Sequence, residues 1–516
     1  MRVIYSTCMA DPWVKVAQKL KHEHGYEPVY WIGYEDDESK KLVPAAFPNL
    51  IYHPYFDACK AVFPQQLVDQ FAGSFFDIEF IKARASFELQ AIKMMDRMDP
   101  DRYSFNFMER QGLYRNFLKY WTAGISYLKP DLVVSGNVPH QVFDYVLYLA
   151  CKLNHIKFLT YRGSAFLGRV IPVTEVSSIG DILDEEYVKM VQSGTETEWL
   201  KRNLPNEILE RYEKVKSDYT MAEPDYMKRQ LLEHRHSSGL LPLTMKFIHD
   251  LNRFKGGYFG KHGFLKKGIP TFFKEQGKNI EDSRTSVWKY SVLKLKANAY
   301  KKRLKEYYDS LVTAPDLNVP YVMVNLHYQP EMSSNPSGDI FVDQRLCVDV
   351  LAQHIPSRFL IYVKEHPSQF FSHLGGHTSR IPGFYDDLIR YPQVRLMPLQ
   401  ADPYTLFKHS RAVATVTGTS GWEAMVLGKP VICFGSPWYE KYSGVLKIDD
   451  EKSAAKIAPF IENYRFDERN LLAYLHAFSH KSIMAYAHRG FKEKMNQDEA
   501  ECVRNLAASV FQMTSW

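Results

Sequence analysis

The sequence lacks any long uncharged hydrophobic run. No stretch of the 516 residues approaches the ~20 apolar residues that a helix needs to cross a bilayer. Asp11, Lys15 and Lys19 closely follow the first short apolar segment, which excludes the hydrophobic core of a signal peptide. Cysteine is scarce as well. The six cysteines are scattered without a CxxC pair, which favours buried, reduced thiols over disulfides or metal ligands. We therefore expect a cytoplasmic protein.

Charge is small overall but unevenly spread. The net charge is +6, whereas residues 245–306 hold 16 Lys/Arg against 5 Asp/Glu. A basic block in an otherwise near-neutral chain indicates an anionic neighbour. Phenylalanines are interspersed in the block, a mixture that suits peripheral contact with the inner face of the cytoplasmic membrane. An anionic glycan and an ordinary solvated helical subdomain are the alternatives. No nucleic-acid-binding motif accompanies the charge, so we expect no nucleic-acid partner.

Strand and helix patterns alternate at both ends of the chain. Strands are predicted at residues 3–5, 29–32, 131–135, 156–160, 321–326, 359–363, 412–417 and 430–434, with helices between them. This order predicts an α/β protein of two doubly wound, Rossmann-like domains that face a ligand cleft. The expected segments are an N-terminal, acceptor-side domain at 1–175, a basic helical insertion at 176–316, a C-terminal nucleotide-sugar domain at 317–455, and closing helices at 456–516 that can pack back on the N-terminal domain.

The most informative segment is the turn at residues 415–424, which reads TVTGTSGWEA. An apolar strand ends, glycines and hydroxyl residues follow, and a helix is predicted from about Trp422. Free backbone N–H groups and the positive end of the helix dipole collect at such a turn and favour a phosphate. Thr419, Ser420 and Gly421 would surround the phosphate, and Glu423 would accept from a ribose diol. The alternative is a simple capping turn.

Two further polar segments follow predicted strands of the same domain. Lys364-Glu365-His366-Pro367 comes after one strand, and the segment at 327–331, HYQPE, comes after another. Because carboxyl ends of parallel strands meet at one sheet edge, both segments are expected beside the turn at 415–424. His366 can donate to a phosphate oxygen and Lys364 can neutralise its charge. A loop histidine that binds backbone carbonyls is the alternative.

Taken in order, HYQPE, KEHP, TGTSGWE and the LGKPV at 427–431 resemble the capsule polysaccharide biosynthesis family over about 321–442. That family includes retaining Kdo transferases and pseudaminic-acid-type transferases. The resemblance implies a GT-B fold, a CMP-activated ulosonic acid held by the C-terminal domain, and no metal or other cofactor. It further implies that Ser420, Gly421, Glu423 and His366 hold the nucleotide. Gln329 and Glu331 would line the donor site.

The N-terminal half is expected to supply the acceptor side and a catalytic carboxylate. His140 and Asp144 follow the strand at 131–135, and their four-residue spacing predicts that they share one helix face. Asp144 is the candidate nucleophile of a two-step, retaining transfer. Its alternative is an acidic residue that simply favours the helix dipole. Arg162, after the next strand, can bind a sugar carboxylate bidentately, or can pair with a surface acid.

These observations favour a glycosyltransferase that moves a ulosonic acid, either Kdo or a nonulosonic acid, from its CMP-activated form. The acceptor would be a surface polysaccharide or a glycolipid. A teichoic-type polyol-phosphate transferase with a CDP donor is one alternative, because it also needs a histidine loop and a Ser/Gly turn. A catalytically inactive capsule-assembly subunit is the other.

Overall fold

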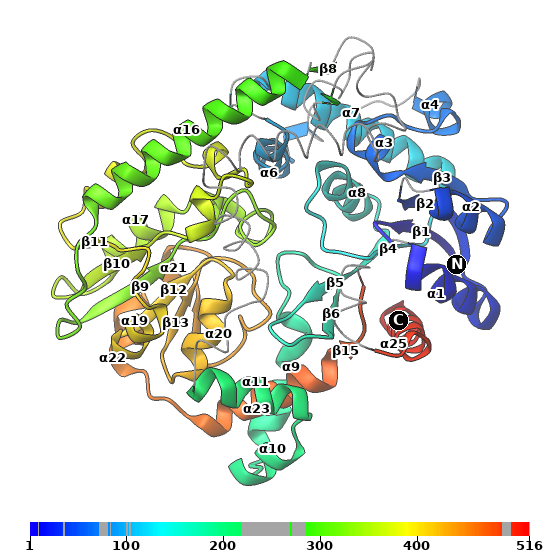
Figure 1. The fold of residues 1–516 in the computed structure, drawn as a ribbon. Helices are drawn as coiled ribbons and strands as arrows, with labels where there is room; N and C mark the ends of the chain where they lie inside the picture. The colour runs from blue at the N-terminus through cyan, green and yellow to red at the C-terminus, as the bar shows by residue number, and fades with distance from the viewer. Residues whose placement is uncertain are drawn as a thin grey trace. The chain divides into compact units, whose positions relative to one another are not determined.

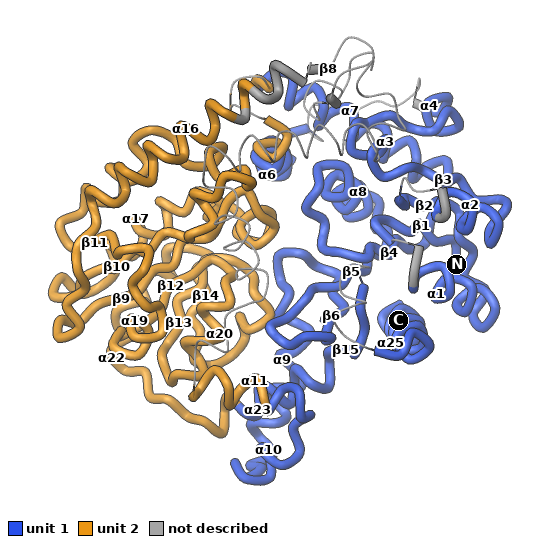
Figure 2. The backbone as a smooth tube through the Cα atoms, viewed as in Figure 1, with its two compact units in different colours: residues 1–94, 107–209, 472–516 blue, residues 95–106, 210–471 orange. Residues whose placement is uncertain are grey.

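A computed structural model gives the fold. It describes residues 1–8, 10–34, 37–71, 81–82, 84–99, 102, 105–217, 269–270, 284–285, 287–487 and 497–514. The chain divides into two compact units (Figure 2): unit 1 holds residues 1–94, 107–209 and 472–516, and unit 2 holds 95–106 and 210–471. Most of the basic block at 245–306 lies outside the described residues. Among those that are described, no helix is both long and apolar enough to cross a membrane.

Unit 1 is built on a seven-stranded sheet in the order β15-β6-β5-β4-β1-β2-β3. Its strands are β1 (Arg2–Ser6), β2 (Glu27–Gly33), β3 (Ile51–Pro54), β4 (Leu132–Ser135), β5 (Lys157–Gly163), β6 (Arg169–Val173) and β15 (Ile483–Met484). The five strands from β5 to β3 are parallel, whereas β6 and β15 add an antiparallel edge. The chain reverses its direction of winding between β1 and β4, so their carboxyl ends flank the switch point where ligands of such sheets bind.

Helices cover both faces of this sheet. They are α1 (Ala10–His24), α2 (Asp37–Ala46), α3 (Tyr55–Cys59), α4 (Gln65–Phe71), α6 (Ala85–Met94), α7 (Phe107–Leu128), α8 (Val142–Leu153), α9 (Asp181–Gln192), α10 (Thr197–Asn203), α11 (Asn206–Ser217), α23 (Glu468–Lys481) and α25 (Glu499–Thr514). The unit boundary falls inside α11 and α23. The last helix, α25, packs against α1 (Figure 1), and Leu506 and Val510 join Trp13 and Leu20 in one buried cluster.

Unit 2 contains a six-stranded, fully parallel sheet in the order β11-β10-β9-β12-β13-β14. Its strands are β9 (Tyr321–Asn325), β10 (Leu360–Lys364), β11 (Val394–Met397), β12 (Ala412–Thr415), β13 (Val431–Cys433) and β14 (Val445–Lys447). The helices are α16 (Val287–Leu311), α17 (Arg345–His354), α18 (Phe384–Ile389), α19 (Pro403–His409), α20 (Thr419–Val426), α21 (Glu451–Ala454) and α22 (Ile457–Asn463). A short antiparallel ladder of β7 (Ile269–Pro270) and β8 (Arg284–Thr285) precedes α16 within the residue range of unit 2.

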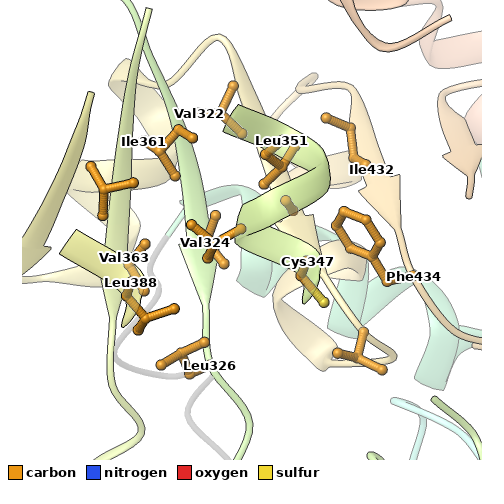
Figure 3. Close-up of a cluster of buried hydrophobic side chains, with 14 of the residues drawn as sticks. Val322, Val324, Leu326, Cys347, Leu351, Ile361, Val363, Leu388, Ile432 and Phe434 are labelled. Atoms are coloured by element: carbon orange, nitrogen blue, oxygen red, sulfur yellow. The ribbon is translucent and has the colours of Figure 1, made fainter. Parts of the chain in front are cut away.

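Alternating apolar residues explain the core of unit 2. Val322, Val324 and Leu326 point to one face of β9, where Leu351 of α17 and Ile361 of β10 pack against them (Figure 3). Strands that are apolar on both faces form a parallel sheet covered by helices. The expected fold class, two Rossmann-like α/β sheets, is confirmed. All six cysteines are described, all are buried, and none forms a disulfide, as the spacing predicted.

Candidate functional site

Three loops meet at the carboxyl edge of the unit 2 sheet. They follow β9, β10 and β12, which are adjacent strands, and the switch point lies between β9 and β12. His327 joins two of these loops. Its Nε2 atom accepts the N–H groups of Val416 (3.2 Å) and Thr417 (3.3 Å). Since Nε2 is an acceptor, His327 is a neutral ring that holds the loop after β12 in place.

A buried ion pair joins the loops after β9 and β10. Arg380 donates to both carboxylate oxygens of Glu365, at 2.7 and 3.0 Å, and neither side chain is exposed. The same guanidinium donates to the carbonyl oxygen of His327 (3.1 Å) and to Oε1 of Gln329 (2.8 Å). Burial by itself would lower the pKa of Arg380. The interactions with Glu365, and to a lesser extent with Tyr385, outweigh the effect of burial, so the pKa of Arg380 is raised. The pair therefore fixes where both loops project.

Gln329 and Glu331 occupy different environments in the loop after β9. Gln329 is buried, and its amide already donates to the Val342 carbonyl (2.7 Å) while accepting from Arg380. Glu331 is exposed and accepts a hydrogen bond from Ser333 (2.9 Å). The buried Gln329 side chain therefore stabilises the loop through its hydrogen bonds, whereas the Glu331 side chain is exposed at the surface of the loop. Their predicted part in lining a donor site stays a prediction.

His366 presents a defined hydrogen-bond donor. Its Nδ1 atom accepts the backbone N–H of Ser368 (3.2 Å), which places the ring proton on Nε2. Burial, together with the nearby cations Lys364 and Arg380, lowers the pKa of His366 to about 3. The ring is consequently neutral at physiological pH. Within the described part of the chain, its Nε2–H has no hydrogen-bond acceptor.

Lys364 is a buried cation at the last position of β10. Its side chain is 6% exposed, and it makes no hydrogen bond or ion pair with any residue that the structure describes. Burial lowers its pKa to about 8, against the opposing effect of Glu365 and Asp402. A buried ammonium without a close partner is costly, and a bound anion would relieve that cost.

The turn before α20 supplies backbone donors. The helix begins at Thr419, three residues earlier than the predicted start at Trp422, because Gly418 serves as its N-cap. Gly418 itself donates to Thr415 Oγ1 (3.1 Å), whereas the N–H groups of Thr419 and Ser420 have no acceptor among the described residues. A side chain on Gly421 would meet the Tyr439 hydroxyl at 2.2 Å, so this position accepts only glycine. Glu423 is buried one turn into the helix.

In unit 1, the relation expected between His140 and Asp144 is wrong. α8 begins at Val142 with Gln141 as its N-cap in extended conformation, so His140 precedes the helix and shares no face with Asp144. His140 Nδ1 lies 2.7 Å from the carbonyl oxygen of Val138, which leaves Nε2 as the basic nitrogen. Asp144 lies in the first turn and is 1% exposed, a rare environment for a carboxylate.

Arg162 also differs from its predicted position. It lies within β5, two strand positions beyond Thr160, and pairs with Ile171 of β6 rather than following the strand. Its 9% exposure excludes the surface salt bridge that was the alternative. Tyr148, one turn further along α8 than Asp144, packs on Phe158 near the start of β5, with ring centroids 5.2 Å apart.

Sequence reasoning missed a row of hydroxyl groups on this face of the sheet. Ser6, Ser135 and Thr160 are register partners across β1, β4 and β5, and all three are buried. Ser6 and Ser135 end their strands, whereas β5 continues past Thr160 to Gly163. Ser135 is engaged by Thr7 (3.1 Å) and by the Asn137 carbonyl (2.7 Å). The hydroxyls of Ser6 and Thr160 have no hydrogen-bond partner among the described residues. The signal was present in the sequence, because each hydroxyl residue directly follows apolar residues of a strand.

Sequence comparisons support the resemblance noted from the motifs. Residues 287–488 match the family described as "Capsule polysaccharide biosynthesis protein", which confirms the resemblance over this part of the chain. The capsule polysaccharide modification protein LipA of Neisseria meningitidis serogroup A is 30% identical over 112 residues. That match covers 22% of this chain and 14% of LipA, so the chain spans about one seventh of the curated relative's length.

Several solved structures are similar at low overall scores. A KpsC β-Kdo 2,4 transferase structure from Thermosulfurimonas dismutans has a TM-score of 0.29 at 14% identity, covering 67% of this chain and 79% of that one. A KpsC β-Kdo 2,7 transferase structure from the same organism has a TM-score of 0.24 at 17% identity, covering 41% and 61%. The UDP-GlcNAc 2-epimerase of Methanocaldococcus jannaschii scores 0.22 at 12% identity, covering 91% and 95%.

Proposed function

We propose that this protein, whose residues 287–488 match the capsule polysaccharide biosynthesis family, is a glycosyltransferase of capsule assembly. It moves a ulosonic acid, Kdo or a nonulosonic acid such as pseudaminic acid, from a CMP-activated donor. The acceptor is a glycan or glycolipid at the inner face of the cytoplasmic membrane. The single observation that carries the proposal is the set of donors at the switch point of unit 2.

These donors match the needs of a nucleotide phosphate. Lys364 supplies a buried positive charge without a hydrogen-bonding partner in the described chain, and His366 supplies a neutral Nε2–H. The N–H groups of Thr419 and Ser420 add the positive end of α20. Their charge and hydrogen bonds would bind the phosphate of CMP and stabilise it as a leaving group. Glu423 accepts from the ribose diol in this scheme.

Unit 1 provides residues for the transfer itself. An Asp144 carboxylate oxygen attacks the anomeric carbon of the sugar, and the bond from that carbon to the phosphate oxygen breaks, so CMP leaves with the electron pair. The acceptor hydroxyl then attacks the same carbon and displaces Asp144, while Nε2 of His140 takes the hydroxyl proton. Two displacements retain the anomeric configuration. Arg162 pairs with the carboxylate of the ulosonic acid.

A donor screen by mass spectrometry tests the proposal. The protein is incubated with a lipid-linked acceptor and with CMP-Kdo, CMP-pseudaminic acid, a CDP-polyol or a UDP-sugar, and the mass added to the acceptor is read. Addition of a ulosonic acid supports the proposal, whereas a polyol phosphate identifies the CDP-dependent alternative. Transfer at the wild-type rate by Asp144→Asn would remove Asp144 from the chemistry. No transfer from any donor would favour an inactive assembly subunit.

A further inference from the structure

A groove on unit 2 is lined in part by the end of the loop that follows β10, but not by Lys364, His366 or the turn before α20. It runs between α16 and the segment that leads into α18, and its volume is about 380 Å³. Tyr300, Arg303 and Tyr307 line one side, at helical spacings of three and four residues that place them on one face of α16. Ile381 and Gly383 line the other side.

The tyrosine rings in the groove are held in fixed orientations. Tyr300 donates from its hydroxyl to the carbonyl oxygen of Arg380 at 2.6 Å, and Tyr307 donates to Asp386. Tyr307 nevertheless leaves 41% of its surface exposed, and Ile381 leaves 44%. Because it is held at its hydroxyl end, Tyr307 offers a preorganised apolar face at little cost in side-chain entropy. The Tyr300 ring is covered by the Arg102 guanidinium, which lies 4.5 Å from the ring centroid.

The groove also contains a cation with no protein partner. Arg303 is exposed and makes no ion pair or hydrogen bond with the described residues, whereas its helix neighbour Lys305 is paired with Asp309. On the other side of the groove, Gly383 has φ +82°, and a Cβ built at this position would have no atom within 4 Å. The groove is therefore open at Gly383. This open position, an exposed ring and a free guanidinium form a site for a flat ligand that carries a carboxylate.

We propose that this groove binds an acidic saccharide, with the C–H face of a sugar ring on Tyr307 and its carboxylate on Arg303. The volume falls in the range of roughly 300–1,000 Å³ that small-ligand pockets occupy, which suits a short oligosaccharide. The inference rests on the proposed function only for the identity of the saccharide, namely the acidic polymer under construction. The groove is thus a second glycan subsite, lined by residues other than the proposed phosphate donors.

Isothermal titration of the full-length protein tests the subsite. The probes are a ulosonic-acid-containing oligosaccharide and a neutral glucan of equal length, each added to wild type and to Arg303→Ala, Tyr307→Ala and Tyr307→Phe. Lys302→Ala is the matched control, because Lys302 is a basic neighbour on α16 that does not line the groove. We expect the acidic oligosaccharide to bind about tenfold more weakly to Arg303→Ala and Tyr307→Ala. The control should bind like wild type, whereas Tyr307→Phe, which keeps the ring but loses its hydrogen bond to Asp386, should fall between wild type and Tyr307→Ala.

Other outcomes of the same experiment overturn the subsite. Equal binding by wild type and both alanine variants would place the saccharide elsewhere, and equal affinity for the neutral glucan would refute the acidic class. A third probe, vesicles of phosphatidylglycerol, distinguishes binding to a membrane surface from binding to a saccharide. Vesicle binding that is lost in Arg303→Ala, without oligosaccharide binding, would identify a lipid face instead. CMP binding is measured in every variant and should not change. If the proposed function is wrong, the wild-type protein will bind no CMP, and this result can be distinguished from the loss of saccharide binding.

Discussion

Binding of CMP is expected to draw a proton onto Lys364. The ammonium is buried without a hydrogen-bonding partner among the described residues, and its pKa is lowered to about 8. A phosphate beside it would return the pKa toward its ordinary value of 10.5. If the return is complete, proton uptake is about 0.1, 0.5 and 0.9 per CMP at pH 7, 8 and 9. The phosphate of CMP, with a second pKa of roughly 6, is almost fully ionised over this range and adds little.

The assay is isothermal titration of CMP in paired buffers that differ in ionisation enthalpy. The slope of the observed enthalpy against the buffer enthalpy gives the number of protons taken up. Lys364→Met is the control, because it keeps an apolar side chain of similar length and removes the titrating group. We expect uptake to rise steeply with pH in wild type and to be absent in Lys364→Met. Uptake that is flat with pH, or equal in the two proteins, would refute the assignment of Lys364 to the phosphate.

Stability in the absence of CMP gives an independent readout of the same group. The unfolded chain binds more protons than the folded chain between pH 8 and 10.5, because the folded pKa is the lower one. The free energy of unfolding of wild type should therefore rise over that window. Lys364→Met should lack this rise and should be more stable than wild type at pH 7, by about 3 kcal/mol at most.

Three further predictions concern Glu365 and His366 in unit 2 and Thr160 in unit 1. Glu365→Gln should lower the free energy of unfolding by about 3–5 kcal/mol in urea titrations, because it leaves the buried Arg380 unpaired; a loss below about 1 kcal/mol would contradict the ion pair's role. The folded pKa of His366, about 3, lies below its ordinary 6.5, so stability should fall by about 1 kcal/mol from pH 6.5 to 5.5 in wild type. His366→Gln should show a smaller fall, and an identical acid profile in the two proteins would argue against a buried neutral ring. Thr160→Val should match or exceed wild-type stability in thermal unfolding, since the lost hydroxyl has no partner in the described chain; a loss above about 2 kcal/mol would reveal a partner.

Apolar periodicity was sufficient to predict the framework of the protein. The strands around β1, β4, β9, β10, β12 and β13 were all located, because buried parallel strands read as short apolar runs between turns. Shorter elements were missed. β15 has only two residues, and β14 has three that are half-buried, whereas the equally short β13 is fully buried and reads as an apolar run. β6 was not predicted, because it pairs with β5 in an antiparallel hairpin and so departs from the expected alternation of strand and helix.

The loops of the candidate site could be located from the sequence, but the buried side chains that hold these loops in place could not. His366, Lys364 and the turn at Thr419 follow strand ends, which sequence pattern locates directly. Arg380 lies in an irregular segment and reaches Glu365 across fifteen positions of sequence, so only the fold reveals that the two meet. The misplaced start of α20 has a local reason. Gly418 caps the helix without a side chain, so Thr419 and Ser420, which were expected in the turn before the helix, lie inside its first turn.

A crystal structure of the protein with CMP is the most direct test of the central claim, that the loops after β9, β10 and β12 of unit 2 hold a cytidylate. The account predicts a phosphate within hydrogen-bonding distance of Lys364 Nζ, of His366 Nε2 and of the N–H groups of Thr419 and Ser420, with the ribose at Glu423. A CMP molecule bound away from these atoms, or saturating CMP with no density at the switch point, would contradict it.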